Sequence, residues 1–478
     1  MPMTSANQTA HTSPAPVVSA SADLSPLSES VRRFHGWEPL RIEGELPRGL
    51  RGSLVRAGPG LMERFGRRLL HSFEADGALI GLRLGGDGSA DGAVRVVESE
   101  GYRAEEAAGK PLYGSAAPWW RRFTNGLRQR IKETGNTSVL SWQGRAFALM
   151  ESGRPMELDP NTLGSLGVSD LGGVVGQAFS AHPHRLDARG VTYNFGQTFG
   201  PKPTLELYAL PDQGAPRRLG VVPVPFNTMI HDFAVTDRYL VFVLSSLKLK
   251  LGRALLAPKD MLSLMDWYPE GASLMLVPLD NIDAPIRVPI EPRFVFHLVN
   301  AFERGDELVV DFIQYADLSV ITALSRNNPD SSSPPKLQRV VVAPSARSLR
   351  SDERLWEQSC EFPVMPARSV GKGYSDVWMV TGEEDKATGL VRLNVDTQEA
   401  QTWTAGDGVV PAEGVFVANP EAERDEQGWI ISLVCDGWAD ASYWAVLDSE
   451  RIADGPVAKI WMDQPLPQTF HGVWMPSA

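Results

Sequence analysis

Residues 428–448 read GWIISLVCDGWADASYWAVLD, and this pattern decides the fold. Its two apolar runs, GWIISLVCD and YWAVLD, are rich in β-branched and aromatic residues, and Gly and Asp lie between them, as between neighbouring strands. Segments of the same kind, among them YLVFVL (239–244) and LVRLNV (390–395), recur roughly every ten to twenty-five residues. Long amphipathic helical patterns are nearly absent, so the sequence predicts an all-β protein.

The distribution of these strands favours one large β-propeller. The chain has 478 residues, enough for two or three ordinary domains or for one large all-β unit. No change of composition and no linker rich in Pro and Gly interrupts residues 31–478, which fits a single propeller domain better than two sandwiches. No repeat of fixed period is visible, so the number of blades cannot be counted from the sequence.

Composition describes a globular protein that does not bind nucleic acid. Residues 1–30 are rich in Ser, Ala, Thr and Pro and lack the regions of a secretory signal, so we expect a disordered tail on a cytoplasmic protein. Cys360 and Cys435 are too few for a disulfide framework and are expected to be reduced. The net charge of −12 argues against phosphate binding, and no apolar run is long enough to span a bilayer.

Two segments combine apolar and basic residues. The run WWRRFTNGLRQRIK, Trp119 to Lys132, could touch an anionic lipid surface, but we favour a solvated helix face for it. The segment from Ser245 to Tyr268 places Leu, Met and Trp among several lysines and an arginine, a composition typical of a membrane interface. A buried helix or pair of strands explains the second pattern equally well, and both interpretations stay open.

Four of the eight histidines lie inside or at the end of apolar, strand-like segments. They are His182 in FSAHPH, His231 in TMIHDF, His297 in FVFHLVNAFE and His471 in TFHGVW. Imidazole is a common ligand of transition metals, and we interpret the four as ligands of one metal ion. None belongs to a short motif such as HExxH, and a single histidine on an apolar strand is more often a core residue. In a propeller, however, the innermost strands converge on the axis, so ligands far apart in sequence can meet there.

Three glutamates are placed to complete such a site. Glu151 in ALMESGRP, Glu361 in SCEFPV and Glu413 in PAEGVFV each adjoin apolar strand residues, where an unpaired charge would be costly. Metal-bound imidazoles usually donate their second N–H to a carboxylate or carbonyl, which fixes the tautomer and the ring orientation. We predict that the three glutamates are these acceptors; surface carboxylates at strand ends are the alternative.

The order and content of these segments resemble one known family. The matching stretches begin with RGLRGSLVRAGPG near residue 50, continue through HSFEADG, GYRAEEAAGKPLY, NTSVLSWQGRAFALMESGRPMELDPNTLGSLG, FSAHPH, IHDFAVT, FVFHLVNAFE and CEFPV, and end with AEGVFV and FHGVW. They cover nearly everything after the tail and occur in the family's order. The chain thereby resembles the carotenoid cleavage oxygenase family, most closely its bacterial apocarotenoid 15,15′-oxygenases.

The resemblance implies a fold and a set of site residues. The implied fold is a seven-bladed β-propeller with a cap of loops and short helices over the active-site face. It implies one Fe(II) per chain on the axis, bound by His182, His231, His297 and His471, whereas His184 falls where the family varies. Glu151, Glu361 and Glu413 match the family's three glutamates next to the ligands. Thr137 matches a threonine whose methyl lies near a vacant coordination position, and Met150, Met229, Phe296 and Phe362 match positions that line the substrate tunnel.

The resemblance also implies an activity. The expected reaction uses O₂ to cleave a conjugated C=C bond of an apocarotenoid into two carbonyl products, with the 15,15′ bond and retinal as the expected case. The electron-rich alkene supplies the electrons, so no organic cofactor is implied. The stretch 247–267 matches an apolar patch beside the tunnel mouth, which favours peripheral membrane association for uptake of a lipophilic polyene. No obligate protein partner is implied.

Departures from the family pattern leave the substrate open. HSFEADG replaces the commoner FDGDG and RAGPG replaces RNGPG, but Gly58, Pro59 and Gly77 remain, as structural turns require. Met150 stands where apocarotenoid enzymes often carry Trp and lignostilbene-cleaving relatives a phenolate-binding Lys, which counts against a phenolic stilbene. Two alternatives remain: cleavage of a stilbene or phenylpropenoid by the same iron site, and a propeller that binds lipophilic ligands without catalysis. The complete set of four histidines and three glutamates speaks against the second.

Overall fold

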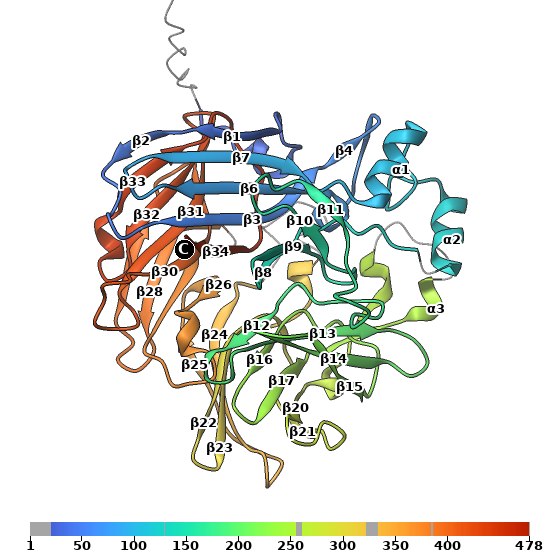
Figure 1. The fold of residues 1–478 in the computed structure, drawn as a ribbon. Helices are drawn as coiled ribbons and strands as arrows, with labels where there is room; N and C mark the ends of the chain where they lie inside the picture. Colours follow the sequence, from blue (N-terminus) through green and yellow to red (C-terminus); the bar gives the residue numbers. More distant parts are fainter. Residues whose placement is uncertain (1–20, 129, 255–260, 322–332, 384–385, 478) are drawn as a thin grey trace, which may run out of the picture.

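The computed structural model describes residues 21–128, 130–254, 261–321, 333–383 and 386–477. In this part of the chain the strands form seven sheets of four or five strands, arranged as a ring (Figure 1). The fold is a seven-bladed β-propeller with few helices. The predicted fold class is therefore confirmed.

The polypeptide builds the blades one after another, and each blade is an antiparallel sheet. Blades 2 to 4 consist of β8 (Ser138–Trp142), β9 (Arg145–Leu149), β10 (Met156–Leu158) and β11 (Ser165–Val168); of β12 (His184–Leu186), β13 (Val191–Thr198), β14 (Thr204–Pro211) and β15 (Arg217–Pro223); and of β16 (Phe233–Val235), β17 (Tyr239–Leu244), β20 (Ser273–Pro278) and β21 (Ile286–Pro289). Blades 5 and 6 consist of β22 (Phe294–Arg304), β23 (Glu307–Tyr315), β24 (Lys336–Ala343) and β25 (Ser348–Trp356), and of β26 (Ser359–Val364), β27 (Asp376–Glu383), β28 (Lys386–Asn394) and β29 (Ala400–Thr404).

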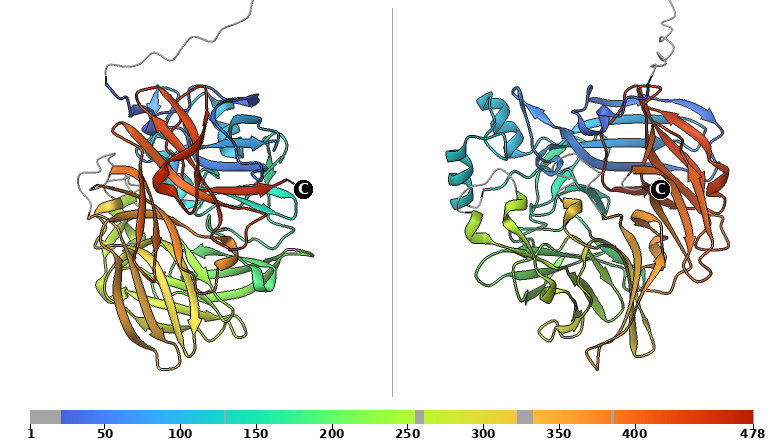
Figure 2. Two further views of the ribbon diagram at one scale, coloured as in Figure 1. Left: turned by 90° about the vertical axis from the view of Figure 1, so that its left-hand side faces the viewer. Right: turned by 180° about the vertical axis from the view of Figure 1, so that it is seen from behind.

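Segments from both ends of the chain complete the first and last blades and thereby close the ring (Figure 2). Blade 1 has the strand order β1–β7–β6–β3–β34, so the C-terminal strand pairs with β3. Blade 7 has the order β2–β33–β32–β31–β30, so an N-terminal strand pairs with β33. Their strands are β1 (His35–Pro39), β3 (Gly52–Leu61), β6 (Asp76–Leu84), β7 (Ala90–Val96) and β34 (Gly472–Pro476), and β2 (Arg41–Gly44), β30 (Val409–Ala418), β31 (Gly428–Asp436), β32 (Ala441–Asp448) and β33 (Pro456–Trp461).

Apolar clusters fill the spaces between neighbouring blades. Leu433 and Trp444 of blade 7 pack against blade 1, whereas Val434 and Tyr443 on the opposite face pack against blade 6. Both faces of a blade are therefore covered, and its strands need apolar residues at successive positions rather than at alternate ones. This explains why residues 428–448, which form β31 and β32, read as two nearly continuous apolar runs.

The innermost strands of the blades surround the axis in the order β34, β8, β12, β16, β22, β26 and β30. Most neighbours in this ring are in contact, among them β16 with β22, β26 with β30 and β34 with β8. Side chains on these strands, or directly before them, are therefore brought together although they are far apart in the sequence.

Helices lie in the connections between strands. α1 (Glu100–Ala108) and α2 (Trp119–Leu127) precede blade 2, and α3 (Leu251–Ala254) lies in blade 4, on the same side of the molecule in Figure 1. Two small hairpins, β4 (Glu63–Arg64) with β5 (Arg67–Arg68) and β18 (Leu247–Leu249) with β19 (Met265–Trp267), complete the strands. The 3-10 helices are η1 (Ser25–Ser28), η2 (Ser72–Glu74), η3 (Asp187–Arg189), η4 (Met261–Leu264), η5 (Pro269–Gly271), η7 (Ala367–Ser369) and η8 (Ile452–Asp454). None of the helices in the described ranges could cross a membrane.

The predicted disordered tail of residues 1–30 is too long. Residues 1–20 lie outside the described part, but residues 21–30 pack on the propeller. The Asp23 N–H donates to the Gly437 carbonyl at 2.8 Å, and the Leu27 carbonyl accepts from Gln468 at 3.1 Å. These bonds tie the segment to the turn between β31 and β32 of blade 7 and to the stretch that follows β33, contacts that local composition does not reveal.

The basic run is only partly a solvated helix face. The Lys132 side chain is only 9% exposed, and its Nζ lies 2.7 Å from Asp76 Oδ2 and 2.6 Å from Glu105 Oε2. Trp119 and Trp120 on α2 are instead more than half exposed. The run thus contains a buried ion-pair partner and an exposed aromatic pair.

The stretch 247–267 does not present all of its predicted membrane-facing residues. Leu247 is fully buried and packs in the apolar cluster between blades 5 and 6, where Leu249 and Met265 also pack. The reason is the antiparallel pairing of β18 with β19, which lays this hairpin against the core. Trp267 is exposed. Leu255 and Leu256 lie outside the described residues.

Candidate metal centre

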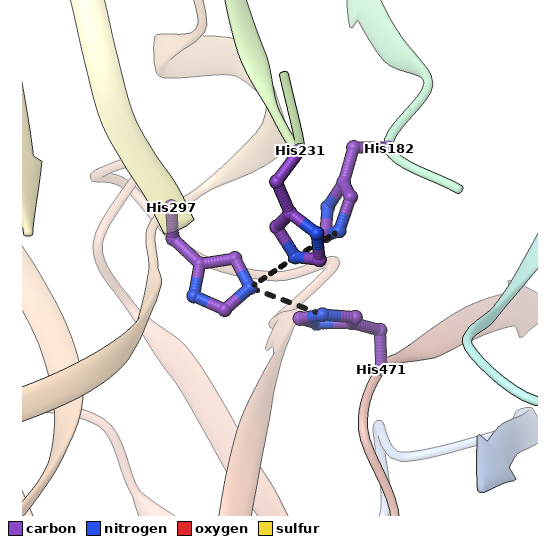
Figure 3. Close-up of side chains that lie close together, drawn as sticks. All are labelled: His182, His231, His297 and His471. Atoms are coloured by element: carbon purple, nitrogen blue, oxygen red, sulfur yellow. Dashed lines mark hydrogen bonds between the residues drawn. The ribbon is translucent and has the colours of Figure 1, made fainter. Parts of the chain in front are cut away.

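Four histidines from four blades meet on the propeller axis (Figure 3). His182 lies two residues before β12 and His231 two residues before β16, whereas His297 lies within β22 and His471 directly before β34. All four positions belong to innermost strands or to the residues leading into them. The structure therefore brings together the histidines that the sequence analysis selected.

The four rings point their Nε2 atoms at one another. These atoms are 3.0 Å apart between His182 and His231, 3.2 Å between His231 and His297, and 3.2 Å between His297 and His471. A metal bonded to imidazole nitrogens at about 2.1 Å holds nitrogens at right angles to one another about 3.0 Å apart. The observed spacing fits ligands arranged around one ion.

Burial keeps two of these rings neutral, as metal binding requires. Burial, together with the neighbouring His231, holds the pKa of His182 well below its usual range. Burial also lowers the pKa of His471, although Glu413 works in the opposite direction. Neutral imidazoles have a free nitrogen lone pair for a cation.

Each of the three remaining blades contributes one carboxylate to the outer side of this group. Nδ1 of His297 donates to Glu361 Oε2 at 2.6 Å, and Nδ1 of His471 donates to Glu413 Oε1 at 2.7 Å. Nδ1 of His231 lies 2.8 Å from Glu151 Oε1. The hydrogen bonds to Glu361 and Glu413 fix Nδ1 as the protonated nitrogen of His297 and His471 and leave Nε2 directed at the centre, whereas Glu151 approaches His231 without a well-formed hydrogen bond. Seven blades thus supply four histidines and three glutamates, one from each blade.

β-Bulges turn several of these side chains inward. The register of β22 shifts between Val295 and Leu298, around His297, and that of β26 shifts between Glu361 and Val364. β30 has the same irregularity between Pro411 and Gly414, around Glu413. A bulge re-aims the side chain at its position, and here it does so at the sites that face the axis.

The Glu361 carboxylate is held ionised inside the protein. Burial opposes the charge of Glu361, but contact with His297 outweighs it and lowers the pKa of Glu361. The same carboxylate raises the pKa of His297 to about 9, against the effect of burial on that ring. A metal would have to displace the proton from this imidazole.

Two residues that the sequence analysis missed complete the hydrogen bonding of the glutamates. Tyr315 donates its hydroxyl to Glu361 Oε1 at 2.9 Å. Arg56, which is fully buried on β3, lies 3.3 Å from Glu413 Oε2 and donates to the Glu413 and Phe470 carbonyls and to Thr469 Oγ1. The Arg56 guanidinium therefore holds the segment directly before His471 in place. The RAGPG motif was interpreted only as a turn, although its buried arginine was the available signal.

His182 has no glutamate beside its Nδ1, and Glu151 Oε1 lies 4.0 Å from its Nε2. Its Nδ1 lies 3.9 Å from Oδ1 of Asp232, a buried carboxylate that receives a hydrogen bond from Nε2 of His184 at 2.7 Å. The structure thus separates the two histidines of AHPH, because His182 joins the central group and His184 turns to Asp232. Sequence analysis did not single out Asp232.

The predicted tunnel residues divide into two groups. The rings of Phe296 and His231 are 5.1 Å apart, and the Phe362 ring lies 5.2 Å from His297, so both phenylalanines border the histidines. Met229 packs in the same apolar cluster as Phe296. Met150 instead directs its sulfur at the Thr134 N–H, 3.1 Å away. Its place in a tunnel remains a prediction.

Thr137 is buried between blade 2 and the segment of His471. Its carbonyl accepts the His471 N–H at 3.1 Å, and its hydroxyl donates to Asn136 Oδ1 at 3.1 Å. Asn136 in turn donates to the Phe73 and Ala75 carbonyls of HSFEADG. That motif therefore supports the residue expected near the metal.

Close packing requires glycine at positions 58 and 77 of the two altered motifs. A Cβ on Gly58 would lie 2.8 Å from Thr469 Cα, and one on Gly77 would lie 2.6 Å from the Thr134 carbonyl oxygen. Both glycines allow close approach of the backbone segments that lead to His471 and Thr137. The glycines have a structural role, but they lie within strands β3 and β6 and not in the predicted turns.

The chain matches a known protein family over almost its whole length. The model of the family described as retinal pigment epithelial membrane protein matches residues 29–476. The chain belongs to this family. The match spans the seven blades and all seven histidine and glutamate positions.

Individual relatives agree with this assignment. The apocarotenoid-15,15′-oxygenase of Synechocystis sp. is 30% identical over 91% of this chain and 92% of its own. The isoeugenol monooxygenase of Pseudomonas putida is 27% identical over 91% and 94%. The solved structure of cobalt-substituted Synechocystis ACO superposes with a TM-score of 0.87 at 27% identity, covering 94% of this chain and 98% of that one.

The relatives define the general class of the chain. They are named oxygenases and dioxygenases, and this family member is an oxidoreductase of the same type. The four-histidine group fits the iron site of the family.

Proposed function

We propose that the protein is an Fe(II) dioxygenase that cleaves a conjugated C=C bond of an apocarotenoid, at the 15,15′ position to give retinal. His182, His231, His297 and His471 are the proposed iron ligands. The observation that carries the proposal is the convergence of four Nε2 atoms, each 3.0–3.2 Å from a neighbour in the group, with carboxylates behind three of the rings.

The protein's own groups have defined tasks in this proposal. Bound iron would supply the redox-active centre at which O₂ is activated. Glu151, Glu361 and Glu413 hold the Nδ1 protons and orient the rings, so that four neutral imidazoles face the ion. Phe296 and Phe362 cover the centre with apolar surface, which excludes water and suits a polyene. The electron-rich alkene supplies the electrons, and no organic cofactor is needed.

An apocarotenoid substrate is supported by the Synechocystis relative, which is named for its action on the 15,15′ bond. A second candidate is a phenylpropenoid, because the isoeugenol monooxygenase of Pseudomonas putida matches over the same share of the chain. The two candidates differ in polarity. The apolar rings at the centre and the absence of a lysine at Met150 favour the polyene.

The experiment that tests the function uses protein loaded with Fe(II) in the presence of O₂. The protein is incubated with apocarotenals of several lengths, a 4-hydroxystilbene and isoeugenol, and the products are identified by mass. Retinal from an apocarotenal supports the proposal, whereas cleavage of isoeugenol alone would replace it with the second candidate.

Substitution of the histidines tests the ligand assignment. His231→Ala should abolish both iron binding and cleavage. His35→Ala is the matched control, because His35 is also buried but its Nδ1 lies 2.8 Å from the Gly36 carbonyl, away from the group. Full activity in His231→Ala would remove His231 from the ligand set.

We further propose that the enzyme takes up its lipophilic substrate at a membrane surface. Trp119, Trp120 and Leu127 on α2 are exposed by 55–62%, and Arg121 lies over the Trp120 ring. Trp267 is exposed too. Exposed tryptophans beside arginines are typical of segments that lie in an interface. The supporting surface therefore includes α2 in addition to the stretch 247–267.

Liposome flotation tests this second proposal. Replacing Trp119 and Trp120 together by Ala should reduce binding to anionic vesicles. Trp438→Ala on blade 7 is the control, since Trp438 is 40% exposed but lies on a different blade. Equal binding by both variants would contradict the assignment of α2.

A further inference from the structure

Asp232 is a buried carboxylate, and both of its oxygens accept hydrogen bonds. It is 4% exposed and follows His231 directly. Oδ1 accepts the Phe233 N–H at 2.7 Å and Nε2–H of His184 at 2.7 Å. Oδ2 accepts the Leu298 N–H at 2.8 Å. A buried charge with this many donors is stabilised by fixed positions of its partners.

The partners of Asp232 belong to the segments that carry three of the histidines. His184 lies two residues after His182 on blade 3, and Leu298 follows His297 on blade 5. Asp232 itself belongs to the segment of His231 in blade 4. One carboxylate therefore links three blades directly behind the metal centre. Leu298 lies at the bulge of β22, so this bond also holds the distortion that aims His297.

Asp232 also faces His182, the one histidine of the four that has no glutamate beside its Nδ1. Its Oδ1 is 3.9 Å from Nδ1 of His182, whereas His231, His297 and His471 have carboxylates at 2.6–2.8 Å. At 3.9 Å there is no hydrogen bond, but in a buried site the carboxylate charge still acts on the polar N–H of the neutral His182 ring. His182 therefore has a negatively charged neighbour, Asp232, that is more distant than the glutamates beside the other three histidines.

We propose that Asp232 is a positioning residue and the fourth carboxylate of the centre: it aligns the segments of His182, His231 and His297 and supplies the negative charge that faces His182. This inference rests on the proposed metal site. It assigns His184 the task of anchoring Asp232 rather than of binding metal. It also explains why the site needs only three glutamates.

The test compares metal affinity in variants of the full chain, with cobalt(II) as the probe and a chromophoric chelator as the competitor. Asp232→Asn keeps the size of the side chain and removes its charge. We expect its cobalt affinity to fall by roughly 10–100-fold, the range for changes of groups that orient ligands, and its visible cobalt absorption to shift. Glu361→Gln, which alters a direct partner of His297, calibrates the size of the effect.

Asp311→Asn is the matched control. Asp311 is also fully buried and is bonded to Arg339 and the Tyr374 hydroxyl, but it lies on β23, outside the innermost strand. This variant should lose stability yet keep the cobalt affinity and spectrum of the unaltered protein. A general effect of weakening a buried carboxylate would change both variants alike and overturn the inference.

The outcomes separate this inference from the proposed function. If the unaltered protein binds no cobalt, the metal site itself fails. If it binds cobalt and Asp232→Asn binds equally well with the same spectrum, only the role of Asp232 is disproved. Should Asp232→Asn not fold, His184→Ala replaces it, because the His184 side chain is 26% exposed. A several-fold loss of cobalt affinity in His184→Ala supports the inference, and an unchanged affinity overturns it.

Discussion

Phe362 has a left-handed backbone conformation, with φ of 54°, at the bulge of β26. Such a conformation costs a residue with a Cβ about 1–2 kcal/mol, and strain of this kind gathers at functional sites. Here it presents the phenylalanine ring to His297 and His471, at 5.2 and 5.6 Å between ring centroids. The backbone N–H of Phe362 also bonds to Glu361.

This strain predicts that, at position 362, glycine is a more stable replacement than alanine, the reverse of the usual order in a strand. Phe362→Gly should be more stable than Phe362→Ala by about 1 kcal/mol, because only glycine adopts positive φ without a steric penalty. At Phe416 on β30, where φ is not positive, the Ala variant should be the more stable by about 0.5–1 kcal/mol. Urea unfolding of the four variants measures both differences. If the alanine variant is the more stable one at both sites, the backbone at Phe362 is not strained.

Arg56 is the second residue with a measurable role. It is the cation beside the buried Glu413, and burial lowers its own pKa while Glu413 raises it. Arg56→Met should lower the free energy of unfolding by about 3–5 kcal/mol, since it leaves a buried carboxylate without its cation. Arg56→Lys keeps the charge and should lose less. Denaturant unfolding of metal-free protein gives the values, and a loss under 1 kcal/mol in Arg56→Met would refute this role.

The sequence could identify the candidate metal ligands, but not the residues that hydrogen-bond to the carboxylates around them. The four histidines were recognisable because imidazole is unusual in apolar strand segments, and the family pattern separated His182 from His184. Arg56 and Glu413 are 357 positions apart, and no local signal connects them. Asp232 was equally hidden, because its partners are donors from other blades.

At the scale of elements, α1 is attached to blade 1 by a buried charge cluster. Glu105 accepts the N–H groups of Leu112 and Tyr113 through Oε1, and its Oε2 lies 2.6 Å from Lys132. Its neighbour Glu106 is 52% exposed and bonds only to Arg64 among the contacts described. The two adjacent glutamates therefore face different environments on one helix.

This difference predicts unequal effects of the same substitution. Glu105→Gln should destabilise the helix and the following loop by about 2–3 kcal/mol, because a buried charged group loses its matched partners. Glu106→Gln should cost about 0.2–1 kcal/mol, as for an exposed ion pair. Hydrogen exchange of the α1 amides measures both values. Similar exchange in the two variants would show that α1 is not held by Glu105.

Strands were easier to predict than the details within them. Segments such as YLVFVL are apolar throughout because blades cover both of their faces, and this pattern reads directly from the sequence. Bulges at His297, Glu361 and Glu413 depend on the register with a partner strand and leave no local pattern. The sequence left the hairpin β18–β19 open between a membrane interface and a buried pair of strands for a related reason, since Leu247 looks the same in an interface as in a core.

At the scale of the molecule, the ring is closed by chain ends. β34 pairs with β3 and β2 pairs with β33, so blades 1 and 7 each combine residues from both termini. The blade count was not readable because the spaces between blades are filled by different side chains, without a repeated motif. The family resemblance supplied the number seven, and the structure confirms it.

Closure of this ring predicts that metal stabilises the whole protein and not one loop. The four histidines come from blades 1, 3, 4 and 5, so a bound ion connects segments spread over most of the ring. A ligand bound only by the folded state adds about 4 kcal/mol to the free energy of unfolding at a thousandfold excess over Kd, which for a chain of this size raises Tm by roughly 4 °C.

The cobalt-loaded protein should show this rise by both circular dichroism and tryptophan fluorescence. A chelator should reverse it, and the rise should vanish in His297→Ala but persist in His35→Ala. A rise in only one signal would mean that the ion stabilises a part of the propeller, and an unchanged Tm after verified loading would mean that the unfolded chain binds cobalt as tightly as the folded protein does.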